Sequence, residues 1–326
     1  MTRPRLTVAQ YVEGVRRGDR AVLARAITLV ESRLTEDAGI AAAVLDALVP
    51  YAGGARRVGI TGVPGVGKST FIDALGMHLI AERDLRVAVL SVDPSSPVSS
   101  GSILGDKTRM ERLVLEERGY VRPSPAGGLL GGVARHTPEA MILCEAAGFD
   151  VVLVETVGVG QSETAVRAMT DFFLLLLLPG AGDELQGIKR GIVEMVDAVA
   201  VNKADGEQVA AAERARTEYQ AALRLIAADG WRPPVMTCSA LRGEGMAQIW
   251  DVVERHRTES VAAGRFEARR RSQALAWMHG LLREGLEAAF RARPDVAAAL
   301  PGLEAEVAAG RTTPFAAARS LLAAAR

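Results

Sequence analysis

Residues 57–70, Arg-Val-Gly-Ile-Thr-Gly-Val-Pro-Gly-Val-Gly-Lys-Ser-Thr, decide the fold of this chain. A short apolar strand leads directly into Gly62-x4-Gly67-Lys68-Ser69 and then into a helical pattern, which is the context that a phosphate-binding P-loop requires. The glycines allow positive φ angles and bring backbone N–H groups close to phosphate oxygens, and the following helix adds its positive amino-terminal dipole. The stretch therefore predicts a nucleoside triphosphate site. A glycine-rich strand-to-helix turn without a ligand is the alternative.

Lys68 is expected to reach the β- and γ-phosphates and to act in catalysis, and the hydroxyl of Ser69 is expected to ligate Mg²⁺. The residues expected to surround the phosphates are Gly62, Val63, Pro64, Gly65, Val66, Gly67, Lys68, Ser69 and Thr70.

A second motif predicts which base is bound. An apolar strand ends in Asn202-Lys203-Ala204-Asp205. Asp205 can accept hydrogen bonds from N1–H and N2–H₂ of guanine, and adenine lacks the 2-amino group. Asn202 can pair with N7, while the stem of Lys203 lies over the purine plane. The nucleotide is therefore predicted to be GTP or GDP. A helix-capping Asp205 after an ordinary strand is the alternative.

A third segment supports the guanine interpretation only because it follows the other two. The sequence from Pro233 onward predicts a last short strand and then a loop of Ser239, Ala240 and Leu241. In guanine-nucleotide sites such a loop closes over the base with backbone N–H groups near O6.

Composition sets outer bounds on the function. The chain has 326 residues, with 39 Lys plus Arg and 39 Asp plus Glu, so no overall field favours nucleic acid or an anionic membrane. The most apolar run, Phe172–Leu178, suits a buried parallel strand and is too short to span a bilayer. Cys144 and Cys238 form no disulfide or metal-binding spacing. These features predict a cytoplasmic protein with neither a nucleic-acid nor a membrane partner.

The chain is expected to have three parts. Residues 1–50 form a helical extension in which Asp19 caps a helix, residues 51–257 form the G domain, and residues 258–326 form a carboxy-terminal helical arm. Continuously apolar strands that alternate with helices predict an α/β P-loop NTPase fold, with a mostly parallel sheet covered by helices on both faces. The strands are predicted at Arg57–Ile60, Arg86–Val92, Val151–Glu155, Phe172–Leu178, Ala198–Asn202 and Val235–Thr237.

Acidic residues follow the strands at the sheet edge where ligands bind. Asp93 ends the second predicted strand and Glu155 the third, so either carboxylate can bind Mg²⁺ opposite Ser69. Asp106 belongs to a segment that could fold over the site, where it would orient the attacking water or complete the metal shell. For each acid, a turn or cap carboxylate is the alternative.

Two glycine-rich loops are candidate switches that differ between the GTP and GDP states. They are residues 125–132 and residues 179–191, and the second follows the leucine-rich strand. Simple connections without a signalling role are the alternative.

Over roughly residues 40–260 the sequence resembles the MeaB/ArgK family, P-loop GTPases of the SIMIBI class associated with methylmalonyl-CoA mutase. The resemblance rests on residues 62–70, 91–96, 155–163, 179–189 and 202–205. The Glu-Thr-Val-Gly run from Glu155 and the loop from Asp183 to Lys189 are its most specific parts.

This resemblance implies a homodimeric GTPase that chaperones an adenosylcobalamin-dependent mutase, gating cofactor loading and protecting the mutase. It places Asp93, Asp106 and Glu155 in the Mg²⁺ and hydrolysis site. It also makes the carboxy-terminal helices a dimer arm. The residues that would report the nucleotide state to the mutase are Asp183, Gln186 and Lys189.

Two other functions remain open at this point. One is an ATP- or GTP-dependent kinase of a transport system, a function attached to the ArgK name; it needs no guanine reader, so Asn202–Asp205 argues against it. The other is a metal-insertion GTPase, which would carry Cys or His ligand pairs near the switch. The sequence shows no such pairs, so zinc or nickel binding would be needed to revive this alternative.

Overall fold

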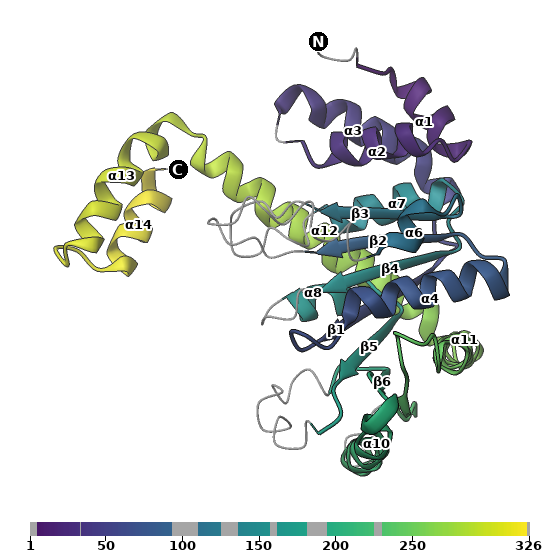
Figure 1. Ribbon diagram of the computed structural model, residues 1–326. Coiled ribbons are helices and arrows are strands. Elements are labelled where there is room, and N and C mark those ends of the chain that lie inside the picture. The colour runs from purple at the N-terminus through teal and green to yellow at the C-terminus, as the bar shows by residue number, and fades with distance from the viewer. Residues whose placement is uncertain are drawn as a thin grey trace. The chain divides into compact units, whose positions relative to one another are not determined.

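The structure is a computed structural model, and it describes residues 5–32, 34–92, 110–124, 136–156, 162–180, 194–224 and 230–324. Within these residues seven parallel strands form one sheet in the order β3-β2-β4-β1-β5-β6-β7 (Figure 1). Their bounds are β1 Arg56–Gly62, β2 Val87–Val92, β3 Gly119–Ser124, β4 Val151–Thr156, β5 Phe172–Leu177, β6 Ala198–Val201 and β7 Val235–Thr237.

Helices cover both faces of this sheet, as the sequence predicted. Successive residues of β5 show why: Phe172 and Leu174 belong to one hydrophobic core, and Phe173 and Leu175 belong to the other. Because side chains alternate across a strand, a run that is apolar at every position must be buried on both sides. The helices between the strands are α4 Lys68–Arg83, α6 Glu111–Leu115, α7 Thr137–Ala146, α8 Ser162–Arg167 and α10 Val209–Leu223, and α11 Met246–Ala262 follows the last strand.

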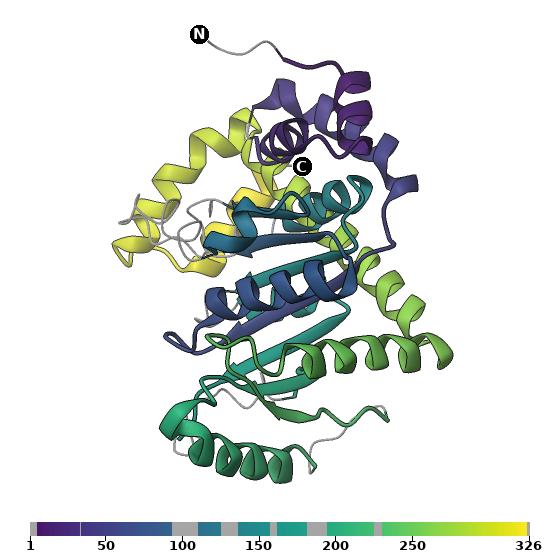
Figure 2. The same ribbon diagram turned by 45° about the vertical axis from the view of Figure 1, so that its right-hand side comes forward.

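One core lies between the sheet and α4, α6 and α11, and Figure 2 shows α4 running along that face. The other core lies between the sheet and α7, α8 and α10. Short 3₁₀ turns occur at Val49–Tyr51 and Gly206–Gln208. The fold is therefore the predicted α/β P-loop architecture, which brings the carboxyl ends of all the strands to one edge.

The amino-terminal helices α1 Val8–Arg16, α2 Arg20–Val30 and α3 Thr35–Leu48 pack against α7 and extend the second core. The predicted cap is confirmed, because the Asp19 carboxylate accepts from the backbone N–H groups of Ala21 at 2.8 Å and Val22 at 3.0 Å.

The chain divides into two compact units, Met1–Phe266 and Glu267–Arg326. The helices α12 Arg265–Arg291, α13 Pro294–Ala308 and α14 Pro314–Ala324 account for most of the second unit. Among the described residues, no helix combines the length and apolar character that crossing a membrane requires. The three-part division of the chain stays a prediction.

Strand β3 was not among the predicted strands. Its sequence, Gly-Tyr-Val-Arg-Pro-Ser, contains no continuous apolar run, and it pairs only with β2 at the edge of the sheet. Proline is tolerated on an edge strand because its missing N–H need not pair with a neighbour. An edge position therefore hides the pattern by which the central strands are recognised.

Candidate nucleotide-binding site

The predicted strand–loop–helix of the P-loop is confirmed, since β1 ends at Gly62 and α4 begins at Lys68. Gly67 precedes the helix with a φ of 89°, in the left-handed region that favours glycine. A Cβ atom at this position would also lie 3.1 Å from the Nδ2 atom of Asn202. The glycine therefore allows both the turn and the close approach of the loop that carries Asn202.

Lys68 folds back onto its own loop. Its Nζ atom donates to the carbonyl oxygens of Gly62 at 2.8 Å and Val63 at 3.3 Å. Burial lowers the pKa of the Lys68 ammonium, while the negative charges of Glu155 and Glu163 oppose that shift. Two backbone carbonyls thus hold the ammonium at the loop, where an incoming phosphate can replace them.

Two buried oxygen ligands meet beside Lys68. The hydroxyl of Ser69 donates to Oε1 of Glu155 at 3.0 Å, and the Ser91 hydroxyl lies 3.5 Å from the other carboxylate oxygen. Ser69, Ser91 and Glu155 are all buried. Hydroxyl and carboxylate oxygens suit a hard cation such as Mg²⁺, so the donor set fits the predicted metal site. Ser91 begins the segment 91–96 that carries the family resemblance, but the sequence assigned it no role.

Asn202 connects three segments of the site. Its Nδ2 atom donates to the P-loop carbonyl of Val66 at 2.8 Å, and its Oδ1 atom accepts from the backbone N–H of Ala240 at 3.0 Å. The neighbouring Lys203 donates from Nζ to the carbonyl of Gly65 at 2.8 Å. The loop after β6 is therefore fastened to the P-loop and to the loop after β7.

The carboxylate of Asp205 is held by a neighbour. The Ser239 hydroxyl donates to Oδ2 of Asp205 and accepts from the backbone N–H of Arg242 at 3.2 Å. These contacts fix the carboxylate at the side of a pocket lined by Gly67, Thr70, Asn202, Lys203, Asp205, Gln208, Ala240 and Leu241. A carboxylate in this place can accept from two donors on the edge of a purine.

The structure thus brings together the described residues that the sequence assigned to the nucleotide. Gln208 lines the same pocket and was not predicted, because it follows Asp205 in a short turn that no motif covers. The remaining predicted residues lie outside the described part of the chain: Asp93, Asp106, Asp183, Gln186 and Lys189. The candidate switch loop at 125–132 lies outside it too, as does the loop at 179–191 beyond residue 180. Within the described part, no group of three or more His, Cys, Asp or Glu side chains could hold a metal ion.

Residues 23–295 match the family described as "Methylmalonyl Co-A mutase-associated GTPase MeaB". The chain is 49% identical over 274 residues to the GTPase ArgK of Escherichia coli, covering 83% of this chain and 82% of that protein. It is 45% identical over 327 residues to the mitochondrial methylmalonic aciduria type A homolog of Mus musculus, covering 97% and 79%. A crystal structure named LAO/AO transport system kinase superposes with a TM-score of 0.75 at 37% identity, covering 98% of each chain.

Replacing Lys68 with alanine should lower GTP hydrolysis by about a hundredfold or more, because the charge directed at the phosphates is lost. Single-turnover hydrolysis of GTP measures this effect. Arg83→Ala, at the exposed far end of the same helix, is the matched control and should hydrolyse GTP at the wild-type rate. Unchanged turnover in Lys68→Ala would exclude the P-loop assignment.

Replacing Asp205 with asparagine should weaken GTP binding by about a hundredfold or more, since two hydrogen bonds to a charged acceptor are lost. The same variant should gain affinity for xanthosine triphosphate, because the amide can donate to O2 of xanthine and still accept from N1–H. Calorimetric titration with both nucleotides measures the exchange. Glu207→Gln, on the exposed neighbouring turn, should bind GTP normally. Full GTP affinity in Asp205→Asn would show that Asp205 does not read the base.

Proposed function

Since the chain belongs to the MeaB family of GTPases, we propose that it hydrolyses GTP in order to chaperone an adenosylcobalamin-dependent acyl-CoA mutase, methylmalonyl-CoA mutase. The family's description supports this choice of partner, and so does the relative named for methylmalonic aciduria. In this role the protein gates loading of the cobalamin cofactor into the mutase and protects the loaded enzyme.

The contacts of Asn202 carry the nucleotide part of the proposal. One buried side chain bonds both to the P-loop at Val66 and to the loop after β7 at Ala240. The loop that would contact the phosphates and the loops that would contact the base are therefore held at a fixed separation. A ligand that fits must present a triphosphate and a purine at that separation. We propose that Asp205 selects guanine within this arrangement, with Ser239 holding its carboxylate in place.

For hydrolysis we propose that Ser69 and Glu155 hold Mg²⁺, together with Asp93 and Asp106. The ion would neutralise charge that develops on the β- and γ-phosphates. Lys68 would contribute a second positive charge after leaving the carbonyls of its own loop. Hydrolysis that continues without a divalent cation would exclude this assignment.

We propose that the segment between β5 and β6 reports the nucleotide state to the mutase. It contains Asp183, Gln186 and Lys189, and it begins at the edge of the sheet where the P-loop lies. A charged segment at that edge can respond to the γ-phosphate and contact another protein at the same time.

We propose that α12 contributes to a homodimer. Its side chains at Leu275, Met278, Leu282 and Leu286 recur at helical spacing and are all exposed. A stripe of this kind favours burial against another apolar surface, and a second copy of the same chain provides one. Sedimentation as a monomer at micromolar concentration would exclude this interface. We also propose a cytoplasmic location, as the sequence predicted.

A kinase acting in a transport system is the second candidate, and the name of the superposable crystal structure favours it. The two functions differ in nucleotide choice and in product. A kinase predicts transfer of phosphate from ATP to a protein, whereas the GTPase predicts release of phosphate from GTP alone. Competition of ATP with GTP for the site separates the two.

The deciding experiment measures GTP turnover with and without purified methylmalonyl-CoA mutase, with ATP as the control nucleotide. We expect slow turnover of GTP alone, acceleration by the mutase, and no turnover of ATP. Equal turnover in the presence and absence of the mutase would contradict the proposed partnership while leaving the GTPase assignment intact.

Replacing Lys189 with alanine should leave intrinsic GTP turnover nearly unchanged and should reduce its stimulation by the mutase by about fivefold or more. The reason is that Lys189 is proposed to contact the partner and not the phosphates. The same turnover assay measures both rates. Equal loss of the two rates would instead place Lys189 in the hydrolysis site.

A further inference from the structure

Asp197, just before β6, joins several parts of the chain at the edge of the sheet opposite the nucleotide. Its carboxylate accepts from the backbone N–H of Phe173 at 2.9 Å and from the guanidinium of Arg167 at 2.5 and 3.1 Å. Its own N–H donates to the carbonyl of Phe173 at 2.8 Å, and its carbonyl accepts from Nε1 of Trp231 at 2.8 Å. Hydrogen bonds therefore hold both the backbone and the side chain of Asp197.

The ion pair of Arg167 with Asp197 is shielded from water. The side chains are 20% and 6% exposed, and the Nη1 and Nη2 atoms of the guanidinium each contact one carboxylate oxygen, which is the strong geometry for such a pair. His256 of α11 lies 3.6 Å from the same carboxylate. The rings of Phe172 and Trp231 flank this histidine at 5.2 and 4.8 Å.

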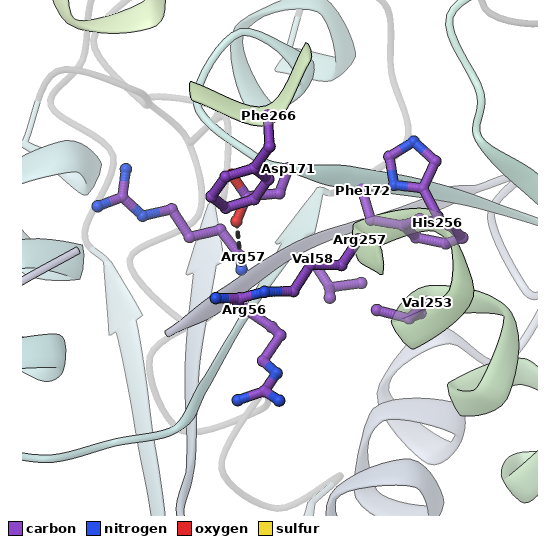
Figure 3. Close-up of a pocket in the computed structure, with 9 residues that line it drawn as sticks. All are labelled: Arg56, Arg57, Val58, Asp171, Phe172, Val253, His256, Arg257 and Phe266. Carbon is purple, nitrogen blue, oxygen red and sulfur yellow. Dashed lines mark hydrogen bonds between the residues drawn. The ribbon is translucent and has the colours of Figure 1, made fainter. Parts of the chain in front are cut away.

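Figure 3 shows two members of this cluster, His256 and Phe172, together at one side of a pocket at the amino ends of β1 and β5. Nearer Phe266 in the same pocket, the Asp171 carboxylate accepts from the backbone N–H of Arg57. All of these groups belong to the edge that faces away from the P-loop, because parallel strands run from this edge to the other.

The two partners of the ion pair lie near the ends of two connections that both begin at the nucleotide edge. The first leaves β4 after Thr156, contains α8, whose last residue is Arg167, and reaches β5 at Phe172. The second leaves β5, contains the proposed mutase-contacting segment and ends at Asp197. The ion pair therefore fastens the far end of one connection to the far end of the other.

Helix α8 also lies very close to the P-loop strand. A Cβ atom on Gly59 of β1 would lie 2.8 Å from Cγ1 of Val166 and 2.7 Å from the ring of Phe173. Helix α8 therefore packs directly on β1 and on the ring of Phe173, with no space even for a methyl group. The same helix carries Glu163, whose charge acts on the Lys68 ammonium, so α8 connects the nucleotide edge with Arg167.

We propose that Arg167 and Asp197 are positioning residues that couple the two connections, so that the nucleotide state sensed beside Glu155 changes the segment that ends at Asp197. This inference rests on the proposed function, because that segment is the one proposed to contact the mutase. The coupling acts through the protein framework, and neither residue touches the nucleotide.

The chain offers a matched control for a purely structural role. Arg57 and Glu145 form another shielded two-point ion pair, with distances of 2.7 and 3.1 Å and exposures of 17% and 1%. That pair joins β1 to α7 and lies in neither of the two connections. Loss of either pair should destabilise the fold comparably, whereas only loss of Arg167 should interrupt the coupling.

The experiment compares wild type, Arg167→Gln, Asp197→Asn and Arg57→Gln. Hydrogen exchange of the peptide covering residues 194–201 is measured with GDP and with a non-hydrolysable GTP analogue. We expect exchange in wild type and in Arg57→Gln to differ between the nucleotides by about fivefold or more. Arg167→Gln and Asp197→Asn should lose the difference, and Arg167→Lys should partly restore it.

GTP turnover with and without methylmalonyl-CoA mutase forms the second arm. Arg167→Gln should keep intrinsic turnover within about twofold and lose most of the stimulation, as expected when a coupling free energy is removed. If the mutase stimulates GTP turnover in neither wild type nor any variant, while the exchange difference still depends on Arg167, the proposed partner is wrong and the coupling stands. Three exchange results overturn the coupling: no nucleotide dependence in wild type, full dependence in Arg167→Gln, or equal loss in Arg57→Gln.

Discussion

The hydrogen bonds of the Asn202 side chain are the interaction on which the nucleotide site depends. This amide is almost fully buried, and it satisfies the carbonyl of Val66 on one side and the N–H of Ala240 on the other. A substitution that removed it would leave two backbone groups without their partner in a region that excludes water, which costs about 1–3 kcal/mol for each. Lys203 adds a link to the P-loop at Gly65, and Ser239 adds one to Asp205, but Asn202 is the residue whose side chain bonds to both neighbouring loops at once.

The sheet makes that link geometrically available. Because β1, β5 and β6 are neighbours and parallel, their following loops emerge side by side at one edge. The register pairs Gly62 with Leu176 and Leu177 with Val201, so the P-loop and the Asn202 loop begin at nearly the same height. The same topology sends the ends of the connecting segments to the opposite edge, where the Arg167–Asp197 pair joins them. The loops of the nucleotide site and the Arg167–Asp197 ion pair therefore lie at opposite ends of the strands.

Sequence reasoning found the parts of this arrangement that are local in the chain. The P-loop and the Asn202–Asp205 motif are contiguous, and each is required by the chemistry of its own few residues. Gln208 was not predicted, because only the path of the turn at Gly206–Gln208 brings it to the pocket. The Arg167–Asp197 pair was not predicted for a different reason, since two residues that lie outside the motifs and 30 positions apart meet only when both connections have returned to the same edge. Pairings created by topology leave no pattern in a single sequence.

Charge balance sets a further condition on nucleotide binding. Glu155 and Glu163 are both buried, and both act on the Lys68 ammonium. A triphosphate adds more negative charge to this region, where the low effective dielectric strengthens repulsion between like charges. One lysine cannot neutralise two carboxylates and a triphosphate, so tight binding requires additional positive charge. The oxygen ligands of Ser69 and Glu155 lie where a divalent cation would supply that charge. The proposed Mg²⁺ site thus follows from electrostatics as well as from the motif.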